Sequence, residues 1–154
     1  MNRVFLIAIF SFLLLLPISH ASEVTSLESD GDVGYRQVGL MWSTDIPSEE
    51  GTVFEVWISN ETIIEISNAT KHSQVRVGNV SNLIQPGIGE WYDDCQYSIG
   101  DENWNPVYRE LDGTAVIPPG AIGVNCTLSG ISSGLEIHLA VLSINPSGGS
   151  ILSS

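Results

Sequence analysis

Apolar and polar residues alternate along two segments in the first half of the chain, residues 35–42 and 53–59. A period of two residues is typical of a β-strand that buries one face. We therefore predict a strand in each segment. The predicted buried faces consist of Val38, Leu40 and Trp42 in the first strand and Phe54, Val56 and Ile58 in the second.

A similar pattern occupies residues 126–150. Residues 126–130 predict a short strand, and residues 136–144 predict a longer one that stops before Asn145-Pro146. The Ser-Ser-Gly sequence at 132–134 is typical of a turn between them. The residues expected to face the core are Leu128, Ile131, Ile137, Leu139 and Val141.

The remaining segments carry weaker patterns. Residues 62–67 and 73–80 predict further strands, and residues 22–34 predict a frayed lead or a short edge strand. Residues 147–154 are rich in Gly and Ser and predict a last half-strand or a flexible end. Residues 22–154 show no convincing amphipathic helix, so we expect an all-β, antiparallel sandwich.

Two stretches resemble the fibronectin type III family. Leu-Met-Trp-Ser-Thr-Asp-Ile-Pro, followed by Phe-Glu-Val-Trp, looks like the second and third strands of that family, with Trp42 in the core. Residues 126–150 look like its closing strands, with Ser133 and Ile137 at positions where Pro and Tyr are usual. The positions that match the closing strands are Leu128, Ile131, Gly134, Leu139, Val141 and Asn145.

The resemblance implies one immunoglobulin-like β-sandwich domain over residues 22–154 and a role in non-enzymatic recognition. Such a domain needs about 100 residues. The surplus predicts an enlarged loop insertion near residues 82–112, centred on Glu90 to Asp112.

The N-terminal segment predicts export. Arg3 precedes an apolar run from Val4 to Leu16 that is too short to span a bilayer, and small residues follow at Ser19 and Ala21. We therefore interpret residues 1–21 as a cleaved secretory signal peptide. The mature chain is expected to be secreted, or periplasmic in a Gram-negative host, without a membrane span.

Export makes a disulfide the natural interpretation of the two cysteines, Cys95 and Cys126. The alternative is a pair of free thiols used for catalysis or metal binding. The chain also carries 18 carboxylates against 5 basic residues, a formal net charge of −13. This charge disfavours nucleic acid and anionic lipid as partners. It is consistent with solubility outside the cell or, alternatively, with binding of a divalent cation or a basic partner.

The segment from Glu90 to Asp112 concentrates aromatic and acidic residues. Flat apolar rings beside hydrogen-bonding groups suit the recognition of a sugar or a peptide. The alternative is a small satellite core under the loop. The candidate ligand-binding residues are Trp91, Tyr92, Tyr97, Trp104 and Tyr108.

A weak calcium-loop spacing lies in the same segment, with Asp101, Asn103, Asn105 and Asp112 at positions 1, 3, 5 and 12. Pro106 occupies the position that requires Gly, so we expect no cofactor, with calcium as the alternative. Four Asn-x-Ser/Thr sequons add candidate glycosylation sites. Their acceptor residues are Asn60, Asn68, Asn79 and Asn125.

No nucleophile elbow or metal motif accompanies His72 or His138, so we do not predict an enzyme. We predict a secreted binding or adhesion module that recognises an extracellular protein or glycan through residues 90–112. The alternative is a structural subunit of an appendage or matrix that self-associates by strand addition.

Overall fold

The computed structural model describes residues 22–34, 36–84, 95–100, 103–131 and 136–154. The predicted signal peptide at 1–21 and the predicted turn at 132–134 lie outside them. Within these ranges the chain forms no helix of the length and hydrophobicity that a membrane span requires. The elements are β1 (Val24–Gly34), β2 (Gln37–Thr44), β3 (Val53–Ser59), the 3-10 helix η1 (Ile66–Asn68), β4 (Thr70–Val77), β5 (Cys95–Ser98), β6 (Asn105–Pro106), β7 (Tyr108–Arg109), β8 (Ala115–Ile117), β9 (Gly123–Ser129), β10 (His138–Ile144) and β11 (Ser150–Ser153).

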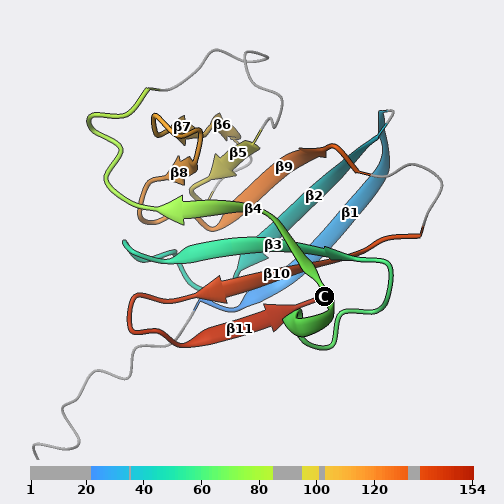
Figure 1. Ribbon diagram of the computed structural model, residues 1–154. Helices are drawn as coiled ribbons and strands as arrows, with labels where there is room; N and C mark the ends of the chain where they lie inside the picture. The colour runs from blue at the N-terminus through green and yellow to red at the C-terminus, as the bar shows by residue number, and fades with distance from the viewer. Residues whose placement is uncertain (1–21, 35, 85–94, 101–102, 132–135) are drawn as a thin grey trace, which may run out of the picture.

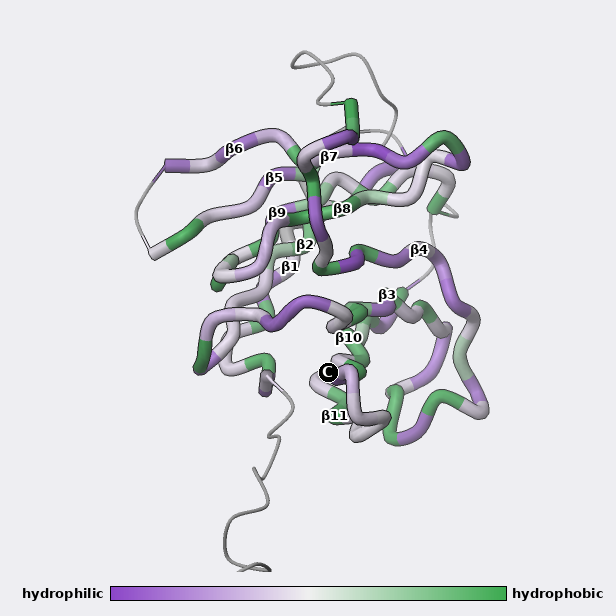
Figure 2. The backbone as a smooth tube through the Cα atoms, turned by 90° about the vertical axis from the view of Figure 1, so that its left-hand side faces the viewer, coloured by the Kyte–Doolittle hydropathy of each residue, from purple (hydrophilic) through white to green (hydrophobic). Residues whose placement is uncertain are grey.

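The strands form two stacked sheets (Figures 1 and 2). The first has the order β1-β2-β9-β5-β6, and the second has the order β11-β10-β3-β4-β8-β7. Neighbouring strands are antiparallel except for the parallel pair β4 and β8. The predicted all-β sandwich is therefore confirmed.

The strand orders follow those of immunoglobulin-like domains. The series β1-β2-β9-β5 corresponds to the A-B-E-D sheet, and β11-β10-β3-β4 corresponds to the G-F-C-C′ sheet. The short strands β6, β7 and β8 are additional and lie between β5 and β9, the fifth and sixth of these strands along the chain. The described part of Glu90 to Asp112 thus supplies edge strands to both sheets.

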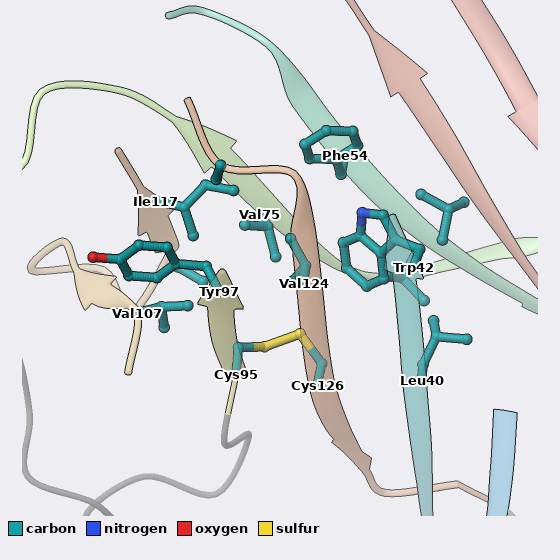
Figure 3. Packing of buried hydrophobic residues seen from close by; sticks show 14 of the residues in the cluster. Leu40, Trp42, Phe54, Val75, Cys95, Tyr97, Val107, Ile117, Val124 and Cys126 are labelled. Atoms are coloured by element: carbon teal, nitrogen blue, oxygen red, sulfur yellow. A yellow bond between two sulfur atoms is a disulfide. The ribbon is translucent and has the colours of Figure 1, made fainter. Parts of the chain in front are cut away.

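The core lies between the sheets, as the alternating pattern predicts. Trp42 on β2 and Phe54 on β3 are 1% and 0% exposed, and their ring centroids lie 5.9 Å apart at an interplanar angle of 58° (Figure 3). Leu40 and Val124 belong to the same cluster, together with Val56. The prediction that Trp42 is a core residue is confirmed.

Two predicted elements differ from the structure. Residues 62–67 do not form a strand. Instead Ile63 is 2% exposed, Ile64 is 85% exposed, and η1 follows. The strand predicted at 73–80 begins earlier, at Thr70, and ends at Val77. Residues 22–34 do form an edge strand, and it is eleven residues long.

The two sides of the sandwich are closed in different ways. On one side the chain passes directly from β6 in the first sheet to β7 in the second, and Val107 between them is 2% exposed. On the other side β1 and β11 belong to different sheets, and the Ser153 hydroxyl donates a hydrogen bond of 3.2 Å to the Val24 carbonyl. Among the described residues, continuous backbone joins the edge strands of the two sheets on the first side and not on the second.

Candidate functional site

The predicted disulfide is present. Cys95 on β5 and Cys126 on β9 are bonded, and their Cα atoms lie 4.0 Å apart at directly opposite positions of the first sheet (Figure 3). The bond lies within one sheet, whereas the disulfide typical of antibody domains joins the two sheets. A disulfide is consistent with an oxidising compartment.

The aromatic candidates within the described residues, Tyr97, Trp104 and Tyr108, do not share one environment. Trp91 and Tyr92 lie outside the described residues. Tyr97 is 6% exposed and packs in the core beside Val107, so its ring is almost entirely shielded from solvent (Figure 3). Burial, followed by the charge of Tyr108 and the hydrogen bond with it, raises the pKa of Tyr97 above its ordinary value. Tyr97 thus fits the core alternative rather than a ligand contact.

Trp104 has a different environment. Its side chain is exposed at the surface, with the residue retaining 37% of its accessible area. Its six-membered ring lies over Gly123 on β9, since a Cβ atom placed at position 123 would be 3.3 Å from Trp104 Cη2. The same Cβ would lie 2.5 Å from the Ser98 hydroxyl oxygen. A larger residue at position 123 would therefore crowd the Ser98 hydroxyl and require a small shift of the indole.

The indole lies on the outer surface of the first sheet. Val124, Cys126 and Leu128 on β9 are buried between the sheets, so Gly123, Asn125 and Thr127, which alternate with them, point outward. Cross-strand pairing places Met41 opposite Asn125, Gly39 opposite Thr127 and Glu28 opposite Met41. Residues from β1, β2 and β9 thus share this surface.

The outer surface of the first sheet is hollowed at Asn125 and Thr127, and neither Trp104 nor Gly123 lines the hollow. A depression of about 390 Å³ lies across the same three strands. We refer to the outward residues Glu28, Gly39, Met41, Asn125 and Thr127, together with Trp104, as the Trp104 face. The residues that line the depression are Glu28, Ser29, Gly39, Leu40, Met41, Asn125 and Thr127.

A second depression, of about 480 Å³, lies at the end of the sandwich where β3 ends and β4 begins. Its apolar part is formed by isoleucines, and its polar part includes two sequon asparagines. Ile64 in the same β3–β4 connection is largely exposed. The lining residues are Ile58, Ser59, Asn60, Glu61, Asn68, Thr70, Ile131 and Ile137.

Three of the four predicted calcium ligands, Asn103, Asn105 and Asp112, lie within the described ranges. Asp101 lies outside those ranges, and Asn103 and Asn105 are exposed. Asp112 lies in the β7–β8 turn, where its Oδ1 accepts a hydrogen bond of 2.9 Å from the Thr114 amide. The hydrogen bonds from Thr114 lower the pKa of Asp112. Across the described residues, no three His, Cys, Asp or Glu side chains cluster in a way that could hold a metal ion.

The four sequons occupy two kinds of environment. Asn60, Asn68 and Asn79 are exposed on connections between strands. The Asn79 side chain accepts a hydrogen bond of 2.9 Å from the Ser81 amide. Asn125 alone is half-buried within a regular strand, on the Trp104 face.

Most of the Trp104 face was not predicted from the sequence. Trp104 and Asn125 were singled out there, but separately, and Glu28, Gly39, Met41 and Thr127 were not. A signal was present, because a glycine inside an alternating strand often marks the close approach of another group. Gly123 is such a glycine.

Comparison of the chain with protein-family models, curated proteins and solved structures found no significant match.

Proposed function

We propose that the protein is an exported, non-enzymatic binding module of the immunoglobulin-like class, related to fibronectin type III domains, that recognises neutral glycans through the Trp104 face. The observation that carries this proposal is the partly exposed Trp104 indole, held over Gly123 on the same outer surface of the first sheet as a polar depression. The disulfide and the strand orders support export and the class of domain.

The chemistry of the face suits a sugar. A pyranose ring has an apolar C–H face that can stack on an indole, while its hydroxyl groups need donors and acceptors. The Asn125 amide, the Thr127 hydroxyl and the Glu28 carboxylate offer both. A depression of about 390 Å³ falls within the size range of small-ligand sites.

The charge restricts the class of glycan. The residues lining the depression include the Glu28 carboxylate and no Lys or Arg among those described. The whole chain has a formal charge of −13. Sulfated and uronic acid glycans would be repelled, so we expect neutral or amino sugars.

The test is a binding screen of the unglycosylated protein, produced in bacteria, against neutral, amino and sulfated oligosaccharides. Loss of one aromatic stacking contact of about 1.4 kcal/mol would weaken binding about tenfold in Trp104→Ala. Trp57→Phe is the matched control, because Trp57 lies on the outer surface of the opposite sheet. Absence of binding to every glycan, or equal loss in both variants, would contradict the proposal.

One observation favours a second function, assembly by strand addition. The edge strand β11 has the sequence Ser-Ile-Leu-Ser, without a charged residue to discourage pairing. An increase in particle mass with protein concentration would support assembly if Ile151→Lys abolishes that increase. A constant monomer mass would exclude it. The edge strand β1, which carries Glu28, is the less suitable surface.

A further inference from the structure

We infer that the Trp104 face also accepts a sugar from the chain itself: an N-linked glycan on Asn125 packs against the Trp104 indole, stabilises the fold and blocks the face, so that only chains without this glycan recognise external glycans. The packing is inferred from the positions of Asn125 and Trp104 on the outer surface of the first sheet. The blocking rests on the proposed function.

The strand presents the sequon in a favourable way. In Asn-Cys-Thr, the Asn125 and Thr127 side chains point outward, while Cys126 points inward to its disulfide with Cys95. The glycan therefore leaves the sheet on its outer surface. Both sequon side chains line the 390 Å³ depression, which gives the first sugar a concave surface to occupy.

Trp104 lies at the position where an aromatic partner is needed. Its ring covers Gly123, which is two residues before Asn125 on the same face of β9. Two residues of a strand span about 7 Å, comparable to the width of one sugar unit with its amide link. The ring thus takes the place that the side chain of residue 123 would otherwise occupy.

The other three sequons provide an internal contrast. Asn60, Asn68 and Asn79 are exposed on connections, whereas Asn125 is half-buried in a strand whose backbone pairs with β2 and β5. A transferase cannot easily reach an asparagine held in this way. We therefore expect transfer to Asn125 to precede folding and closure of the Cys95–Cys126 disulfide.

The transfer requires a lipid-linked oligosaccharide donor and the oligosaccharyltransferase of a secretory pathway. A bond forms between C1 of the first sugar and Asn125 Nδ2, the amide nitrogen loses one proton, and the polyprenyl diphosphate leaves. No oxidant or reductant takes part. The product keeps the Asn125 side chain on the outer surface, with the sugar beside Trp104.

The experiment uses the protein secreted by a eukaryotic host, with two substitutions at one residue. Thr127→Val is nearly isosteric and removes the sequon, whereas Thr127→Ser retains it. Glycopeptide mass spectrometry measures occupancy at Asn125. Endoglycosidase trimming of the glycan to one sugar isolates the contact between that first sugar and the protein. Thermal unfolding measures stability.

We expect Asn125 to be occupied in the parent protein and in Thr127→Ser. Loss of the sugar in Thr127→Val should lower Tm by about 2–4 °C, corrected for the same substitution in bacterial protein. The shift should disappear in a Trp104→Ala background. Ser81→Ala, which removes the sequon of exposed Asn79, should leave Tm unchanged.

Two results would overturn the packing: an unoccupied Asn125 beside occupied Asn60, Asn68 or Asn79, or a Tm shift that Trp104→Ala leaves intact. Blocking is measured separately, by comparing glycan binding of the bacterial protein with that of the Asn125-glycosylated protein. We expect the bacterial protein to bind and the glycosylated protein not to bind. Equal binding by both forms would overturn blocking. If neither form binds any glycan while the Tm shift depends on Trp104, the proposed function and the blocking fail and the packing stands.

Discussion

Cys95 and Cys126 occupy directly opposite positions on the neighbouring strands β5 and β9. Strand β5 has only four residues, and its other neighbour, β6, has two. The disulfide therefore links a short outer part of the first sheet to β9, the strand that carries Asn125 and the glycine beneath Trp104.

Removing this disulfide, whose two cysteines belong to the hydrophobic core cluster, should destabilise the protein. The bond closes a 31-residue separation, for which the chain-entropy model gives about 3.7 kcal/mol. We expect Cys95→Ala/Cys126→Ala to lose up to this amount in urea unfolding. Reduction of the parent protein should give a similar loss, and an unchanged urea midpoint in both cases would contradict the prediction.

The two tryptophans of the first sheet should respond differently to truncation. Trp42 is 1% exposed and contacts Phe54, so Trp42→Ala should cost about 3–5 kcal/mol of unfolding free energy. Trp104 remains 37% exposed, and Trp104→Ala should cost less than half as much. Chemical denaturation of both variants tests the ranking. A larger loss in Trp104→Ala would mean that its indole is structural.

Gly123→Ala should displace the indole. The added methyl group would lie 3.3 Å from Trp104 Cη2 and 2.5 Å from the Ser98 hydroxyl oxygen. The hydroxyl can rotate, so the main change is a shift of Trp104, visible in its fluorescence. We expect a stability loss of about 1–3 kcal/mol. If the clash with Trp104 is the cause, the loss should be smaller in a Trp104→Ala background.

Alkaline pH should destabilise the protein through Tyr97. Its folded pKa is raised above 10.0, mainly by burial. As pH rises past 10.0, the unfolded chain releases this proton first, so the free energy of unfolding falls. Tyr97→Phe should weaken this pH dependence, and absorbance near 295 nm should show one tyrosine titrating late. The same decrease in unfolding free energy at alkaline pH in Tyr97→Phe as in the parent protein would contradict the prediction.

Much of the sandwich could be predicted from local patterns. Residues 53–59 coincide with β3, because alternation is unambiguous where one face is buried. Residues 62–67 also hold β-branched side chains, yet only Ile63 is buried there and Ile64 faces solvent. Their environment depends on the neighbouring connections, which the local pattern does not contain.

The Trp104 face could be predicted only in part. The prediction that residues 90–112 recognise a ligand remains a prediction, now centred on one described residue, Trp104. Tyr97, in the same segment, packs into the core instead. Composition identified the aromatic segment, but only cross-strand register brings Glu28 and Met41 to Asn125.

The chain crosses from one sheet to the other at Val107. Because of this crossing, local unfolding should be harder on that side of the sandwich than on the opposite side. On that side the sheets cannot separate without extracting a buried residue. On the side of β1 and β11, edge strands can detach one sheet at a time. Backbone amides of β1 and β11 should therefore exchange with solvent through small opening events, while those of β9 exchange only when the whole domain unfolds.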